Sequence, residues 1–171
     1  MSAITSMARN LPVVGTKGFE FSETMSGHHV LEEGPQKGKK LPFSFTGRAF
    51  ADSLVGFFDP TNKEDRLTWN LEGELKAEGL AKSARLLHGT IEVHPARKTG
   101  MLHYAFEFNG DDGRRYVFRG NKNRQGLNLV KSMTTLYGTV TDKETGKRIS
   151  QGVTYFDLAT TAAFIKSYKL T

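Results

Sequence analysis

The feature that most constrains the fold of this chain is the alternation of apolar and polar residues, which recurs in several separate segments. One clean example lies between residues 67 and 75, where polar residues separate a regular set of apolar or small ones: Leu67, Trp69, Leu71, Gly73 and Leu75. A repeat of two is typical of a β-strand with one buried and one solvated face. The segment therefore predicts an antiparallel strand.

The strongest local pattern is an aromatic hairpin between residues 101 and 122. Leu102, Tyr104, Phe106 and Phe108 share one face of the first half, and Tyr116, Phe118 and Gly120 share one face of the second half. The residues between them, 109–113, favour turns because they tolerate positive φ and form local side-chain hydrogen bonds. The two aromatic faces coincide only if the loop has an odd number of residues or contains a bulge, a condition that a left-handed Gly113 would meet.

Other segments predict further strands and two helices. Strand patterns occupy residues 19–24, 43–49, 84–93, 132–141 and 148–156, and residues 32–40 predict an exposed basic loop. Asp52 is typical of a helix N-cap, and Pro60 would end that short helix. After Asp157, an apolar stripe at helical spacing predicts a helix near the C-terminus.

About eight strands with short links and little helix exclude a parallel α/β fold. Eight antiparallel strands either close into a barrel or stack as a sandwich. The terminal helix favours a mainly β, lipocalin-like antiparallel barrel with a short C-terminal helix. We expect residues 1–17 to form a flexible arm and residues 18–171 to form a single barrel domain.

Composition restricts the possible chemistry. The chain has 171 residues, no cysteine and a net charge of +6, with 37% hydrophobic and 25% charged residues. Disulfides and thiolate metal sites are excluded, and neither a signal peptide nor a spanning helix is expected, so the expected location is cytoplasmic. The positive charge is compatible with anion binding and equally with an ordinary soluble surface.

Several phrases occur in an order that resembles a known family. They are Phe21-Ser-Glu23-Thr-Met25-Ser-Gly27, Gly89-Thr-Ile-Glu-Val93, Met101-Leu-His-Tyr104-Ala-Phe106, Gly120-Asn-Lys122, Thr134-Thr-Leu-Tyr137 and Gly152. From about Phe19 to Tyr168 the chain resembles a calycin-like accessory domain fused to cholesterol-oxidase-like flavin enzymes of the glucose-methanol-choline class. No dinucleotide fingerprint is present, so the resemblance implies the accessory module alone, with a sterol or other lipid as its ligand and no cofactor.

A candidate ligand site follows from the position of Glu23 on the face of Phe19 and Phe21. A buried carboxylate must be paired, hydrogen-bonded or protonated, and Lys122 is its candidate partner. The candidate ligand-binding residues are Glu23, Tyr104, Phe106, Phe118, Lys122, Thr135 and Tyr137. The alternatives are that Glu23 meets solvent or belongs to a structural network, and that the aromatic residues are plain core.

An enzymatic alternative would use Glu23 as an acid or base with His103 or Tyr104, if these side chains converge. No nucleophile motif is present. His28 and His29 are adjacent, so on a strand they face opposite ways and cannot chelate together. No metal site is expected from the spacing of the histidines.

A third hypothesis concerns a basic hairpin with Arg114, Arg115, Arg119, Lys122 and Arg124. Alternation places Tyr116 and Phe118 on the face opposite Arg115 and Arg119, so stacking rings and charges would face different environments. Nucleic acid is therefore not an expected partner of the protein. An acidic protein or an anionic membrane surface remains a possible partner.

Overall fold

The structure is a computed structural model that describes residues 19–51, 67–93, 102–122, 134–156 and 169–170. Its strands are β1 (Phe19–Leu31), β2 (Lys40–Ala51), β3 (Leu67–Ala77), β4 (Ala81–Arg85), β5 (Leu87–Val93), β6 (Leu102–Asn109), β7 (Arg115–Lys122), β8 (Thr135–Asp142), β9 (Arg148–Phe156) and β10 (Lys169–Leu170). All the pairings between them are antiparallel.

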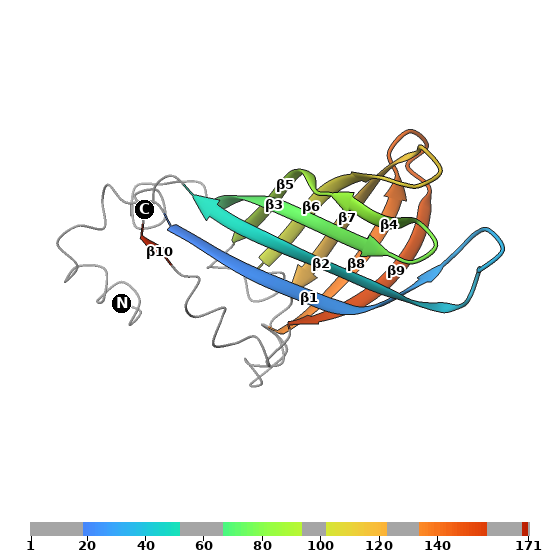
Figure 1. The fold of residues 1–171 in the computed structure, drawn as a ribbon, viewed down its shortest axis with the longest axis horizontal. Coiled ribbons are helices and arrows are strands. Elements are labelled where there is room, and N and C mark those ends of the chain that lie inside the picture. The colour runs from blue at the N-terminus through green and yellow to red at the C-terminus, as the bar shows by residue number, and fades with distance from the viewer. Residues whose placement is uncertain (1–18, 52–66, 94–101, 123–133, 157–168, 171) are drawn as a thin grey trace.

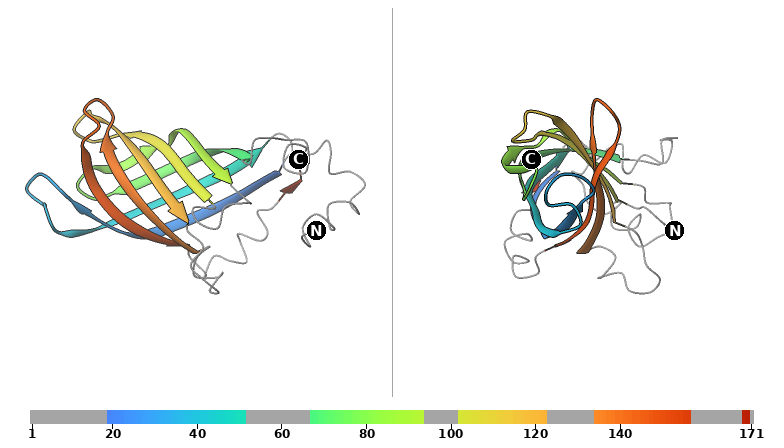
Figure 2. Two further views of the ribbon diagram at one scale, coloured as in Figure 1. Left: turned by 180° about the vertical axis from the view of Figure 1, so that it is seen from behind. Right: turned by 90° about the vertical axis from the view of Figure 1, so that its right-hand side faces the viewer.

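The strands form a closed antiparallel barrel of eight strands (Figures 1 and 2). Each main strand pairs with its neighbour along the chain, and β9 returns to pair with β1, with His29 opposite Gly152. Strands β4 and β5 together occupy one position, since both pair with β3. The predicted mainly β class and barrel closure are thus confirmed.

The aromatic hairpin is confirmed in its register. Phe106 lies opposite Phe118, and the last pair, Asn109 with Arg115, leaves residues 110–114 in the loop. This odd number keeps both aromatic faces on the inside of the barrel. Gly113 has φ of +82°, the left-handed conformation that the sequence predicted for the turn.

The segment predicted as one strand over residues 84–93 is divided into β4 and β5. The break is at Leu86, whose amide donates to the carbonyl oxygen of Gly73. Gly73 is required there, because a Cβ at this position would collide with the carbonyl oxygen of Thr46. β3 pairs with β5 through residues 67–71 and with β4 through residues 74–77.

The interior is built from every second residue of each strand, as in β6, where Leu102, Tyr104, Phe106 and Phe108 are buried. The hairpins β1–β2, β3–β4, β6–β7 and β8–β9 gather at one end of the barrel, and the β1–β2 hairpin extends furthest (Figure 1). We call this the hairpin end. The opposite end, where β1 begins and β7 ends, is called the β1-start end.

Three expectations lie outside the described residues: the arm at 1–17, the helix at 52–58 and the helix after Asp157. Within the described residues, no helix has the length and apolar character needed to cross a bilayer.

Candidate functional site

The centre of the candidate site is an ion pair inside the barrel. The Nζ of Lys122, at the end of β7, lies 3.2 Å from the Oε2 of Glu23 in β1. The two side chains are only 5% and 3% exposed, respectively. Because β7 and β1 are separated by β8 and β9 around the barrel, the pair spans the interior rather than linking neighbouring strands. The predicted partnership of Glu23 with Lys122 is confirmed.

The Glu23 carboxylate has an incomplete set of partners. Its Oε1 is buried and has no hydrogen-bond partner among the described residues. An ionised carboxylate can accept about four hydrogen bonds, and the burial of an unpaired acceptor is costly. This oxygen is therefore the place in the interior where a hydrogen-bond donor from outside the chain would be most stabilising.

Tyr104 forms the third side of the site. Its ring is 2% exposed, and the Nζ of Lys122 lies 4.8 Å from the ring centroid, within the range of a cation–π contact. The ring thus stabilises the ammonium group that also pairs with Glu23. Tyr104 was predicted at this site and lies there.

Phe106 and Phe118 were predicted to line a ligand cavity, and the structure places both inside the barrel. Their rings stack at 4.6 Å, and Phe45 packs edge-on against Phe106 at 5.4 Å. Phe43 stacks on the other side of Phe118 at 5.5 Å. Beside this stack, a cavity next to His29 and Phe43 measures only about 10 Å³, room for about one water molecule. These aromatics are packed core at the level of the stack.

Tyr137 is a correction to the predicted site, whereas Thr135, in the same phase of β8, is only 5% exposed. In β8 the interior face carries Leu136 and Val140, so Thr135 and Tyr137, in the opposite phase, belong to the outer face. Tyr137 is 45% exposed. Strand alternation fixes this outcome, because residues of odd and even number in β8 face opposite sides of the sheet.

The acid/base pairing of Glu23 with His103 is also wrong. His103 alternates with the buried Leu102 and Tyr104 in β6, so it lies on the outer face of the barrel wall, away from Glu23. His28 and His29 face opposite ways as predicted, with His29 only 2% exposed.

Two arginines of the basic hairpin, Arg114 and Arg115, are paired with carboxylates, and Arg124 lies outside the described residues. Arg114 pairs with Asp112 at 2.8 Å and Glu33 at 3.1 Å, and Arg115 pairs with Glu107 at 3.1 Å. Burial by itself would raise the pKa of Asp112, but hydrogen bonds from Tyr116 and from Arg114 lower that pKa to about 2. Arginines held by carboxylates in this way have little charge left for an acidic partner.

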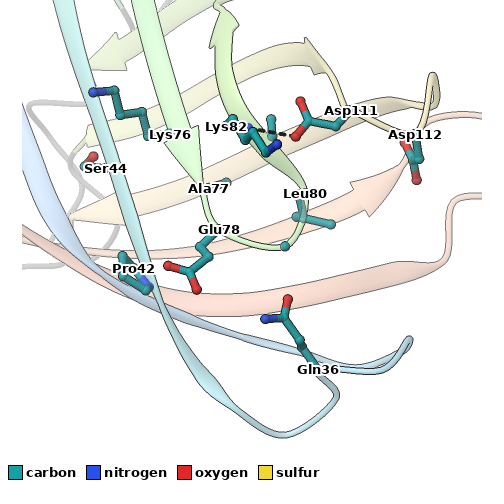
Figure 3. Close-up of a pocket in the computed structure, with 12 residues that line it drawn as sticks. Gln36, Pro42, Ser44, Lys76, Ala77, Glu78, Leu80, Lys82, Asp111 and Asp112 are labelled. Carbon is teal, nitrogen blue, oxygen red and sulfur yellow. Dashed lines mark hydrogen bonds between the residues drawn. The ribbon is translucent and has the colours of Figure 1, made fainter.

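One large hollow was not expected from the sequence. It measures about 680 Å³ and lies outside the barrel at the hairpin end, where Gln36, Pro42, Glu78, Lys82 and Asp111 surround it (Figure 3). Asp111 joins the β6–β7 loop to β4, because its carboxylate accepts from the amide of Lys82 and its amide donates to the carbonyl of Leu80. None of the predicted site residues lines this hollow. Its carboxylates and lysines are mixed, so it has no single charge preference.

Comparisons with protein-family models, with curated proteins and with solved structures find no match. An inference about function therefore rests mainly on the geometry of the Glu23 site.

Proposed function

We propose that this barrel is a non-enzymatic module that binds a small hydrophobic ligand, a lipid or sterol-like molecule, through a hydroxyl group. The observation that carries the proposal is the buried Glu23–Lys122 pair, with one carboxylate oxygen left without a partner. Ligand sites of this kind are mostly apolar and use a few convergent polar groups to orient the ligand. Here the polar groups are one carboxylate and one ammonium.

A hydroxyl is the group that suits this pair best. It donates its proton to Oε1 of Glu23 and at the same time accepts from the Nζ of Lys122. A ketone accepts only, so it would leave Oε1 of Glu23 unsatisfied. A carboxylate would pair with Lys122 but would be repelled by Glu23. The site thus favours an uncharged alcohol over the corresponding ketone or acid.

The packing of the aromatic core favours entry of the ligand from the β1-start end of the barrel. The stack of Phe45, Phe106 and Phe118 fills the barrel toward the hairpin end. The apolar body of the ligand would therefore extend from Glu23 toward the β1-start end, beside Phe21 and Trp69, whose rings are in edge contact at 5.2 Å. The resemblance of the sequence to a calycin-like accessory domain of cholesterol-oxidase-like enzymes supports a sterol in particular.

The test uses Trp69, the single tryptophan of the chain, as an energy donor to the fluorescent sterol dehydroergosterol. We expect saturable energy transfer at equimolar protein and sterol. Unlabelled cholesterol should compete, and its 3-ketone analogue should compete roughly 10- to 150-fold less well, since a lost hydrogen bond to a charged group costs about 1.5–3 kcal/mol. The proposal would be refuted if the sterol gives no saturable energy transfer, or if cholesterol and its 3-ketone analogue compete equally well.

Two variants make the test specific. Glu23→Leu combined with Lys122→Met should remove the preference for the alcohol while keeping the barrel folded. The matched control is Glu20→Gln combined with Arg48→Gln, which removes an ion pair of 2.8 Å on the outside of the barrel. This control should bind the sterol like the unmodified protein.

A further inference from the structure

The outer face of β1, β9, β8 and β7 carries an aromatic and polar surface that the proposed lipid site does not use. Among the described residues, the two exposed large hydrophobic side chains are Tyr137 (45% exposed) and Tyr155 (47% exposed). Tyr155 lies opposite Thr135, so it is the diagonal neighbour of Tyr137 on the adjacent strand. Diagonal pairs on one face of a sheet are within reach of each other's long side chains, so the two rings form one aromatic patch.

Next to this patch the surface is hollowed by about 500 Å³. The lining combines polar side chains, among them Arg119, Asn121 and Gln151, with the apolar Val30 and Val153, and none of its residues is an aspartate or a glutamate. Amide side chains both donate and accept hydrogen bonds, as the edges of nucleobases do. We call this hollow together with Tyr137 and Tyr155 the tyrosine face.

Two cations, Lys40 beside the tyrosine face and Arg119 within it, stand at the ends of one row of paired residues. The register aligns Lys40, Val30, Gln151, Thr139 and Arg119 across five neighbouring strands. With strands about 4.8 Å apart, the two cations lie roughly 19 Å from each other along the sheet. Within the described part of the chain Arg119 has no carboxylate partner, whereas Arg48, Arg114, Arg115 and Arg148 each have one. Arg119 therefore contributes an unpaired positive charge to this face.

We propose that the tyrosine face binds a short stretch of single-stranded nucleic acid. Exposed aromatic rings on a sheet stack with unpaired bases, and a cation at each end of the row holds the phosphates. The absence of carboxylates from the lining and the net charge of +6 complement a polyanion. This face includes the outer side of β7 in the aromatic hairpin, whereas the hairpin's rings Tyr116 and Phe118 are buried inside the barrel.

The binding test uses the full chain and fluorescein-labelled U12, dT12 and a 12-base-pair duplex, with fluorescence anisotropy at 50 mM KCl. We expect both single strands to bind more tightly than the duplex, since stacking requires unpaired bases. The relative affinity of U12 and dT12 tells whether RNA or DNA is preferred. The proposal is overturned if neither single strand binds, or if the duplex binds as tightly as the single strands.

Variants separate stacking from charge. Tyr137→Ala and Tyr155→Ala should each weaken binding by roughly 5- to 150-fold, while the phenylalanine variants at the same positions retain it. Arg119→Gln should lower the slope of log affinity against log salt concentration by roughly one. The matched control Lys82→Gln removes a charge beside the hollow of Figure 3 and should leave affinity within about twofold.

All three sites are on the surface, so the melting temperature should stay unchanged and show that each variant is folded. Alanine variants that bind like the unmodified protein would overturn the proposal even if the single strands bind. This result would be independent of the sterol test, because the tyrosine face and the Glu23 site lie on opposite sides of the barrel wall.

Discussion

Strand β1 carries two buried polar groups on its interior face, and they differ in how completely they are satisfied. His29, toward the hairpin end, is bonded at both ring nitrogens: Nδ1 lies 3.0 Å from the hydroxyl of Ser150, and Nε2 lies 2.9 Å from the carbonyl oxygen of Glu78. Glu23, toward the β1-start end, has Lys122 on one oxygen and no described partner on the other.

The difference separates a structural group from a binding group. A carbonyl only accepts, so Nε2 of His29 carries the proton and Nδ1 accepts from Ser150. The neutral ring thereby joins β1, β9 and the turn after β3 with every polar atom paired. Glu23 has unused capacity, and a polar network that is only partly satisfied costs stability unless something else completes it. A ligand hydroxyl would do so.

The largest expected change in the free energy of unfolding is at the Glu23–Lys122 pair. Lys122→Met leaves the Glu23 carboxylate buried without a counter-charge and should lower the free energy of unfolding at pH 7 by about 3–5 kcal/mol. The double variant Glu23→Leu/Lys122→Met should be at least as stable as the unmodified protein, because it removes both charges. Urea unfolding checks both. If the single and double variants lose the same amount, the pair is a packing element and not a charge pair.

Substitution of His29, whose ring nitrogens are both hydrogen-bonded, should lower the free energy of unfolding less, because it leaves no buried charge without a partner. His29→Leu leaves the carbonyl of Glu78 and the hydroxyl of Ser150 without their partner and should cost about 2–3 kcal/mol. The neighbouring His28 faces outward, so His28→Leu is the matched control and should change stability by less than about 0.5 kcal/mol. Equal losses from the two substitutions would show that the hydrogen bonds of His29 add nothing specific.

The His29 site should also respond to pH. Burial lowers the pKa of His29 below the 6.5 of an ordinary histidine, and the hydrogen bond to the carbonyl of Glu78 opposes this only in part. The unfolded chain therefore takes up the proton first as pH falls. The contribution of His29 to the free energy of unfolding is full above pH 6.5. It is lost as pH falls toward the lower pKa of the folded state, by no more than about 1.4 kcal/mol per pH unit. His29→Leu should remove this component from unfolding curves between pH 7.5 and 5, and an unchanged pH dependence would contradict the assignment.

Much of the fold was predictable because alternation carries the necessary information. The repeat of two placed Glu23 beside Phe21 on the interior face and fixed the odd loop between Phe108 and Tyr116. Once Glu23 was buried it needed a counter-charge, and Lys122 ended the aromatic hairpin on its interior face. The long-range pairing of these two residues therefore followed from local patterns and the cost of burying a charge.

Other features depended on register between strands, which local patterns do not specify. Tyr137 was predicted at the site for its hydroxyl, which could contact the Glu23–Lys122 pair. The phase of β8 was present in Leu136 and Val140, and it would have shown that Tyr137 faces out. The alignment of Arg119 with Thr139 and Gln151, which defines the tyrosine face, arises only when three strands are paired. Packing of the aromatic core likewise depends on how rings from β2, β6 and β7 interlock, which no single segment encodes.

The smallest changes in the free energy of unfolding are expected for the two hydroxyl groups on the interior face of β9, those of Ser150 and Thr154. Ser150 donates to Nδ1 of His29, so Ser150→Ala should cost about 1 kcal/mol by leaving that nitrogen unpaired. The Oγ1 of Thr154 is buried without a hydrogen-bond partner among the described residues, so Thr154→Val, which keeps the shape and removes the unpaired hydroxyl, should be neutral or slightly stabilising. Urea unfolding of the two variants side by side distinguishes them. A loss at Thr154 as large as the loss at Ser150 would mean that satisfaction of hydrogen bonds does not separate structural from unused polar groups in this barrel, and it would weaken the inference drawn from the open oxygen of Glu23.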